Sequence, residues 1–133
     1  MGFAEDIKAF ADKTEEKMNL AVRKIALELF SRVILKTPVA TGRARANWQV
    51  AIGSVPAGTL ELEDKPGTAT ISAAEAAASG LRAGDVIYLA NNLPYIQRLE
   101  DGYSGQAPAG MVGLTVQEFQ GIADRVGLEL SLI

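Results

Sequence analysis

The chain has 133 residues, of which 48% are hydrophobic, a formal net charge of −3, and neither cysteine nor histidine. This length suits a single domain, residues 1–133, and the hydrophobic content excludes a disordered chain. The missing residue types exclude disulfides, thiolate chemistry, a zinc site and a Ser-His-Asp triad. We therefore assign no catalytic, cofactor-binding or metal-ligating residue and predict that the chain is not an enzyme.

The two parts of the chain differ in charge. Residues 1–50 carry nine basic and six acidic groups, whereas residues 51–133 carry four basic and ten acidic groups. Opposite signs on two sides of a subunit suit head-to-tail association in a ring. The alternative is the ordinary imbalance of a soluble protein.

The sequence contains no segment typical of membrane insertion or export. No apolar run approaches the roughly 20 residues of a membrane span. The N-terminus lacks a cationic region followed by an apolar one, and Asp6 breaks the myristoylation pattern. We expect the chain to remain in the compartment where it is made.

Residues 3–36 have the apolar periodicity of one long helix of about 50 Å. Its first half is rich in charge and has one narrow apolar line, whereas residues 20–35 are apolar around most of the circumference. The second half is therefore expected in the core. The first half is expected to project, with Phe3, Ile7 and Phe10 contacting a neighbouring subunit.

A turn is predicted after this helix, because Pro38 cannot continue it and Gly42 favours a reversal. Arg43 and Arg45 follow beside Trp48, the only tryptophan. A shaped, charged docking corner would use this combination. The alternative for either arginine is an exposed cation without a partner.

Residues 46–52 alternate between apolar and polar side chains and predict a half-buried antiparallel strand, with Trp48 as a core anchor. Residues 53–70 are punctuated by proline and glycine and predict a mobile loop or a hairpin arm. The acidic groups within this segment do not have the spacing of a Ca²⁺ loop, so we interpret it as a solvated arm. Residues 85–90 predict a central strand covered on both faces.

Three helical segments are expected in the second half. The capping box Ser72–Glu75 predicts a short helix that ends at Gly80, and residues 95–100 predict a helical turn. The last helix is predicted over residues 109–127, with Gly127 as its stop and Gly121 near another backbone. A second capping box, Thr115–Glu118, indicates a regular start at Thr115, and the predicted apolar stripe consists of Val112, Val116, Phe119, Ala123 and Val126. The remaining tail alternates like a strand and contains three large apolar residues, Leu130, Leu132 and Ile133, which are expected to contact another subunit.

Two segments carry a resemblance to a known family. The run from Thr37 to Trp48, TPVATGRARANW, resembles the TPV-x-TG-x-L-R-x-(S/N)-W motif of the HK97 gp10-like family of tailed-phage neck and tail-completion proteins. The run from Asn91 to Pro108 is similar to that family's "NN-x-x-Y…LE-x-G-x-S…AP" segment, in the expected order and separation. Ala44 departs from the family, which has a larger apolar residue there.

The resemblance implies an α+β fold, with a long N-terminal helix and a C-terminal helix on a small antiparallel sheet. It also implies a structural virion protein in an oligomeric ring, six-fold by the resemblance, at the neck or upper tail. Its partners would be further copies of itself, the adjacent head-closure and tail-terminator rings, and genomic double-stranded DNA passing through the ring. Such a protein assembles in the bacterial host cytoplasm. Arg43, Arg45 and Tyr103 would contact a neighbour or face the DNA.

Three alternatives stay open. The chain could be a tail terminator or a head-closure ring protein rather than a tail-completion protein. It could be a DNA-binding module, although its charge is acidic and it has no known recognition-helix motif. It could be an enzyme that uses carboxylates alone, although the neighbouring Glu100 and Asp101 would diverge on a regular element.

Overall fold

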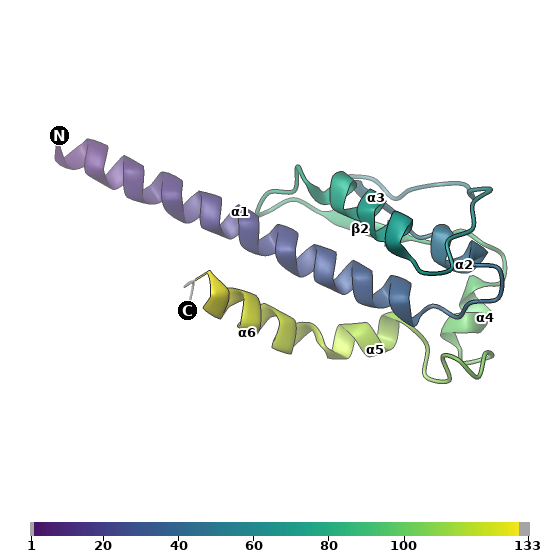
Figure 1. Cartoon of the computed structure of the whole chain (residues 1–133). Helices are drawn as coiled ribbons and strands as arrows, with labels where there is room; N and C mark the ends of the chain where they lie inside the picture. The colour runs from purple at the N-terminus through teal and green to yellow at the C-terminus, as the bar shows by residue number, and fades with distance from the viewer. Residues whose placement is uncertain (1, 131–133) are drawn as a thin grey trace.

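The computed structural model describes residues 2–130 and has an α+β fold (Figure 1). One long helix, α1, runs the length of the molecule and is followed by shorter helices and two strands. In chain order the elements are α1 (Phe3–Lys36), α2 (Arg43–Ala46), β1 (Gln49–Ile52), α3 (Thr68–Ala78), β2 (Ile87–Ala90), α4 (Ile96–Glu100), α5 (Val112–Gln117) and α6 (Phe119–Glu129).

The second half of α1 lies between two layers. The sheet and α3 cover one side, and α5 and α6 run back along the other side (Figure 1). Ala26 and Phe30 of α1 pack with Leu81, whereas Ala21 packs on Ile122 and Val126 of α6. The prediction of a long helix buried on more than one side in its second half is therefore confirmed.

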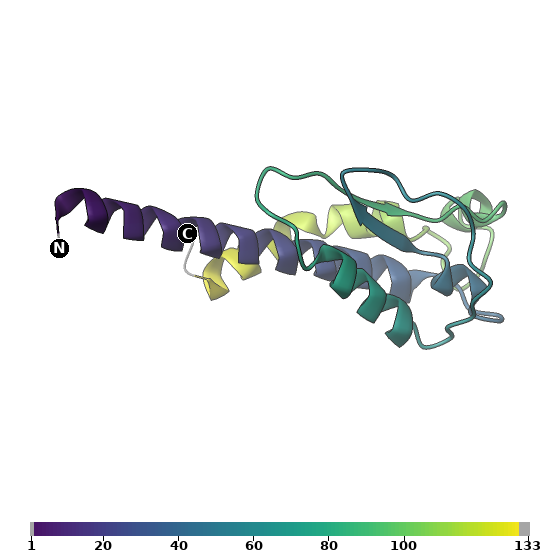
Figure 2. The ribbon, with the colours of Figure 1, turned by 90° about the horizontal axis from the view of Figure 1, so that it is seen from above.

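The first half of α1 projects from this packed body. Figures 1 and 2 show it extending past the end of α6, with no other element beside its first turns. From Gly2 to Met18, every described residue except Thr14 is exposed. The fold is thus a compact body with a helical rod attached.

The sheet consists of β1 and β2 paired antiparallel, with Gln49 opposite Ala90 and Ile52 opposite Ile87. Two predictions about it are wrong in part. The strand expected over 46–52 begins only at Gln49, because Arg43–Ala46 form a helical turn. The segment 85–90 is not a central strand, since β2 pairs with β1 alone among the described residues and each of its positions is half-buried.

The segment 53–70 forms neither a hairpin nor a freely solvated arm. No strand occurs between Gly53 and Gly67, and Thr68–Thr70 already belong to α3. Side chains on neighbouring elements hold this segment. The Asn47 side chain accepts from the Leu60 amide over 2.7 Å and donates to the Leu60 carbonyl over 3.1 Å. The mobility predicted for the loop stays a prediction.

The start of α3 is capped by a residue that the capping-box pattern missed. Ser72 lies inside α3, so Ser72–Glu75 is not a cap. Asp64, which is buried, instead accepts from the Gly67 amide over 3.1 Å and from the Thr70 amide over 2.8 Å. The helix ends at Ala78. Gly80 was expected to end it in the left-handed conformation, but Gly80 does not have a positive φ.

The single C-terminal helix expected over 109–127 is two helices that join at Glu118. Thr115 lies within α5 rather than starting a helix, and its hydroxyl donates to the Met111 carbonyl over 2.8 Å, a contact that bends helices. Gly121 has no neighbour where a Cβ would stand, and α6 continues through Gly127 to Glu129. These predictions were wrong, as was the strand-like tail over Leu128 and Glu129.

Candidate interaction surface

The two segments that resemble the phage family meet at one corner of the molecule. The Gln106 side chain accepts from the Val39 amide over 2.8 Å and donates to the Val39 carbonyl over 3.1 Å. The Asn91 side chain donates to the Ala44 carbonyl over 2.9 Å. A single surface therefore contains residues from both segments, which are about fifty positions apart in the chain.

Gly42 allows the tight turn at this corner. It has a φ of +90°, and its carbonyl accepts from the amides of Asp64 and Ala46, each over 3.0 Å. A Cβ at this position would lie 2.5 Å from the backbone nitrogen of Lys65. Only glycine lets the turn approach the 53–67 segment this closely.

A shallow depression of about 290 Å³ lies where the two segments meet. The turn contributes Pro38, Thr41 and Arg43, and the second segment contributes Tyr95, Leu99 and Tyr103. Tyr103 is 73% exposed and lies under the Arg98 guanidinium, 4.4 Å from the ring centre. Aromatic and arginine side chains of this kind are enriched at protein interfaces.

The two arginines of the turn have different environments. Arg45 donates to three backbone carbonyls, those of Leu35, Thr37 and Lys65, over 2.7–2.9 Å. Its guanidinium therefore joins the end of α1 to the following loop and is not a free cation. The alternative of an exposed cation without a partner is therefore wrong for Arg45, which is half-buried.

Arg43 retains the capacity for a further partner. Its guanidinium lies 3.8 Å from the carboxylate of Glu61, a side chain that is 91% exposed. Its buried Nε has no hydrogen-bond partner among the described residues. Surface ion pairs of this length contribute little. Of the two arginines, Arg43 is thus the candidate for a contact with a neighbour.

The remaining predicted contact residues lie away from the corner. Phe3, Ile7 and Phe10 are 81%, 52% and 73% exposed along the projecting part of α1. Leu130 is half-buried and packs against Ala21, Ile122 and Val126 of its own chain, and its expected contact with another subunit stays a prediction. Leu132 and Ile133 lie outside the described residues.

The apolar stripe predicted for the last helix is also largely wrong. Val112, Val116 and Phe119 are exposed, and the positions that face α1 are Ile122 and Val126. The break at Glu118 changes the phase of the helix, so a stripe drawn through a continuous helix selects the wrong residues.

Ion pairs within the chain join its basic and acidic parts. Glu118 pairs with Lys36 and with Arg32, the latter over 3.3 Å. These contacts lower the pKa of the Glu118 carboxyl, chiefly through the hydrogen bond from Lys36. Part of the charge asymmetry is therefore neutralised inside one subunit, which weakens the case for a head-to-tail ring drawn from charge alone.

Sequence reasoning also missed Glu100, which positions the start of α5. Its carboxylate accepts hydrogen bonds of 2.9–3.0 Å from the amides of Met111, Val112 and Gly113. Burial favours a raised pKa for Glu100, but the three amides outweigh it and the pKa is lowered. The carboxylate thus holds the second segment against α5. An acidic residue twelve positions before the first residue of a helix has no local pattern that would reveal this contact.

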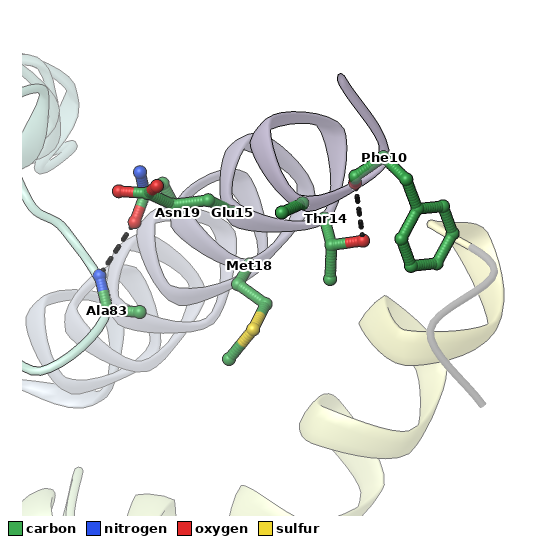
Figure 3. Close-up of a pocket in the computed structure, with 7 residues that line it drawn as sticks. Phe10, Thr14, Glu15, Met18, Asn19 and Ala83 are labelled. Atoms are coloured by element: carbon green, nitrogen blue, oxygen red, sulfur yellow. Dashed lines mark hydrogen bonds between the residues drawn. The ribbon is translucent and has the colours of Figure 1, made fainter. Parts of the chain in front are cut away.

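A second depression lies on the projecting helix. It has a volume of about 400 Å³ and is open, with Phe10, Thr14 and Met18 on one side of α1 (Figure 3). At its other side the Asn19 side chain accepts from the Ala83 amide over 2.8 Å. It contains one carboxylate, Glu15, which pairs with Arg82. This arrangement suits packing of an apolar group.

Between residues 2 and 130, no helix is long and apolar enough to cross a membrane, and no group of three or more acidic side chains could hold a metal ion. Comparisons with protein-family models, with curated proteins and with solved structures find no match to this chain.

Proposed function

We propose that the chain is a structural virion protein of a tailed bacteriophage, which forms an oligomeric ring at the neck or upper tail. The observation that carries this proposal is the meeting of the two family-like segments at one corner. Val39 and Gln106 join them by a reciprocal pair of hydrogen bonds. Segments with a common role in docking would be brought together in this way.

The chemistry of the corner suits a protein partner. The depression is shallow and lined by Tyr95, Tyr103 and aliphatic groups, and Arg43 lies at its edge. An acidic side chain of a neighbouring subunit or of an adjacent ring would pair with the accessible end of the Arg43 guanidinium, since that side chain is 41% exposed. Steering by such charges affects association more than folding.

The first test localises the chain. Particles are purified from cells that express it and are labelled with an antibody against the recombinant protein. We expect label at the junction of head and tail in electron micrographs. Particles that contain the chain elsewhere, or lack it, would contradict the proposal.

The second test reverses one charge at the corner. Arg43→Glu should leave the thermal melting of the isolated protein nearly unchanged and should strongly reduce its incorporation into particles. Lys24→Glu is the matched control, because Lys24 is exposed on α1 away from the corner. Equal incorporation of the two variants would remove the corner from the docking role.

A further inference from the structure

The projecting half of α1 has an apolar face that α6 leaves uncovered. Phe3, Ile7, Phe10 and Thr14 are spaced by four, three and four residues, so they lie along one line of the helix. Ala21, seven residues after Thr14, continues that line and is covered by Ile122 and Val126 of α6. The same face is therefore packed by a helix in one part and open in the other (Figures 1 and 2).

The apolar line of the rod exposes large rings to solvent, although the rest of the rod is rich in charge. Phe3 and Phe10 are 81% and 73% exposed. Phe10 and Thr14 point to the same side of the helix as Met18 (Figure 3). A helix of similar length laid against this line would remove these rings from water, as α6 does for Ala21.

We propose that this face pairs with the same face of a second copy of the chain, as an antiparallel two-helix contact. In a two-fold contact, a residue that faces a given position is faced by that position in turn. Placing Ile7 opposite Phe10 of the second copy also places Phe3 opposite Thr14. Four layers result over about 18 Å of helix, two of Ile7 with Phe10 and two of Phe3 with Thr14.

The residues beside this line determine the register. Asp6, just before Ile7, and Lys13, just before Thr14, occupy equivalent positions seven residues apart on one edge of the apolar line. In an antiparallel pair of helices, equivalent positions on this edge lie beside each other. With Ile7 opposite Phe10, Asp6 lies beside Lys13 of the second copy, and Lys13 beside its Asp6. On the other edge Ala4 meets Ala11, and these small side chains let the helices approach closely.

Other arrangements lack this complementarity. A shift by seven residues one way sets Asp6 against Asp6, and a shift the other way sets Lys13 against Lys13. A parallel pair sets Asp6 against Ala11 and forms no ion pair along these edges. In the proposed register the second helix begins at the level of Thr14, before α6 starts to cover the face at Ala21. The two helices therefore do not compete for space.

Sedimentation velocity of the full chain over a range of concentrations tests the pairing. We expect a reversible monomer–dimer equilibrium. Asp6→Lys or Lys13→Asp should each weaken it by about tenfold, because each reverses two ion pairs of the dimer. An equimolar mixture of the two variants should recover the dimer, as should the double variant. A protein that stays monomeric at every concentration overturns the proposal.

Matched controls separate this register from a general charge effect. Asp12→Lys and Lys8→Asp make the same charge changes on exposed positions that face away from the apolar line. They should leave the equilibrium unchanged, and an effect equal to that of Asp6→Lys would refute the register. Deleting residues 131–133 should also leave the dimer intact. Loss of the dimer on that deletion would assign the contact to the C-terminal residues instead.

Cross-linking gives a direct reading of orientation, because the chain contains no cysteine. Ala4→Cys and Ala11→Cys variants, one of them carrying a mass tag, are mixed under mild oxidation. The expected product is the disulfide that joins position 4 of one chain to position 11 of the other. Preferential pairing of like variants contradicts the antiparallel register. The contact does not depend on the virion role, so its failure would leave the proposed function standing.

Discussion

Trp48 donates its indole N–H to the hydroxyl of Thr37 over 2.8 Å, and Thr37 donates in turn to the Val33 carbonyl over 2.8 Å. Both side chains are buried, with Thr37 completely inaccessible. The chain of hydrogen bonds joins the first residue after α1 to the residue just before β1. These buried hydrogen bonds thus link the turn at the corner to the hydrophobic core.

Replacing the Thr37 hydroxyl should destabilise the fold. Thr37→Val keeps the shape of the side chain and leaves the buried indole N–H without an acceptor, which costs about 1–3 kcal/mol. Urea unfolding followed by tryptophan fluorescence measures the loss. Thr37→Ser is the control, because it retains the hydroxyl, and it should lose clearly less stability. Equal losses for the two variants would mean that packing, rather than the hydrogen bond, matters at this site.

Replacing each of the two arginines of the turn should change the stability of the fold by different amounts. Arg45→Glu removes three hydrogen bonds to backbone carbonyls and places a carboxylate among them, so we expect a loss of about 2–4 kcal/mol. Arg43→Glu disturbs only a long ion pair to Glu61 and should change stability by about 0.5 kcal/mol or less. Thermal melting of both variants provides the comparison. A stable Arg45→Glu protein would contradict the structural role given to Arg45.

Glycine is required at position 42 for two reasons, of which only one applies at position 58. Both residues have positive φ, but a Cβ at Gly42 would meet the backbone of Asp64 and Lys65, whereas Gly58 has open space. Gly58→Ala should cost about 1–2 kcal/mol from the left-handed backbone alone. Gly42→Ala should cost clearly more, to the point of poor folding. Comparable melting temperatures would show that the turn relaxes away from the 53–67 segment.

Acid should weaken the fold through two carboxylates. Burial alone would raise the pKa of Asp64, but hydrogen bonds from Thr70 and Gly67 outweigh it and lower the pKa, and Glu100 behaves in the same way. A group with a lowered pKa in the folded state stabilises the fold above its unfolded pKa of about 4. That contribution disappears as the pH falls through the lower, folded pKa.

The measurement is the free energy of unfolding from pH 6 down to pH 2. Asp64→Asn and Glu100→Gln should be less stable than the parent near neutral pH, and the differences should shrink in acid. A difference that stays constant with pH would show that the charge of these carboxylates is not what stabilises the loops.

The apolar periodicity predicted the full extent of α1, Pro38 and Gly42 predicted the turn before Trp48, and the family resemblance implied the α+β fold class. Sequence patterns failed where a single tertiary contact changes local structure. Asp64 caps α3 from outside any capping motif, and the salt bridge from Lys36 to Glu118 lies at the junction of α5 and α6. For the candidate surface, the sequence indicated the turn and Tyr103. It did not reveal that Arg45 is occupied by backbone carbonyls, because those acceptors come from three separate positions.

The attachment of α1 has a mechanical consequence. From Ala21 onward the helix is clamped between two layers, whereas the sixteen residues Phe3–Met18 form a projecting rod of about 25 Å, with an exposed ion pair from Glu15 to Arg82 near its base. Such a rod acts as a lever. A tilt of about 10° at the clamp moves Phe3 by about 4 Å, a geometric estimate from the same helical rise. A small rearrangement among Ala21, Ile122 and Val126 is therefore converted into a displacement at the tip that is large enough to make or break a contact there.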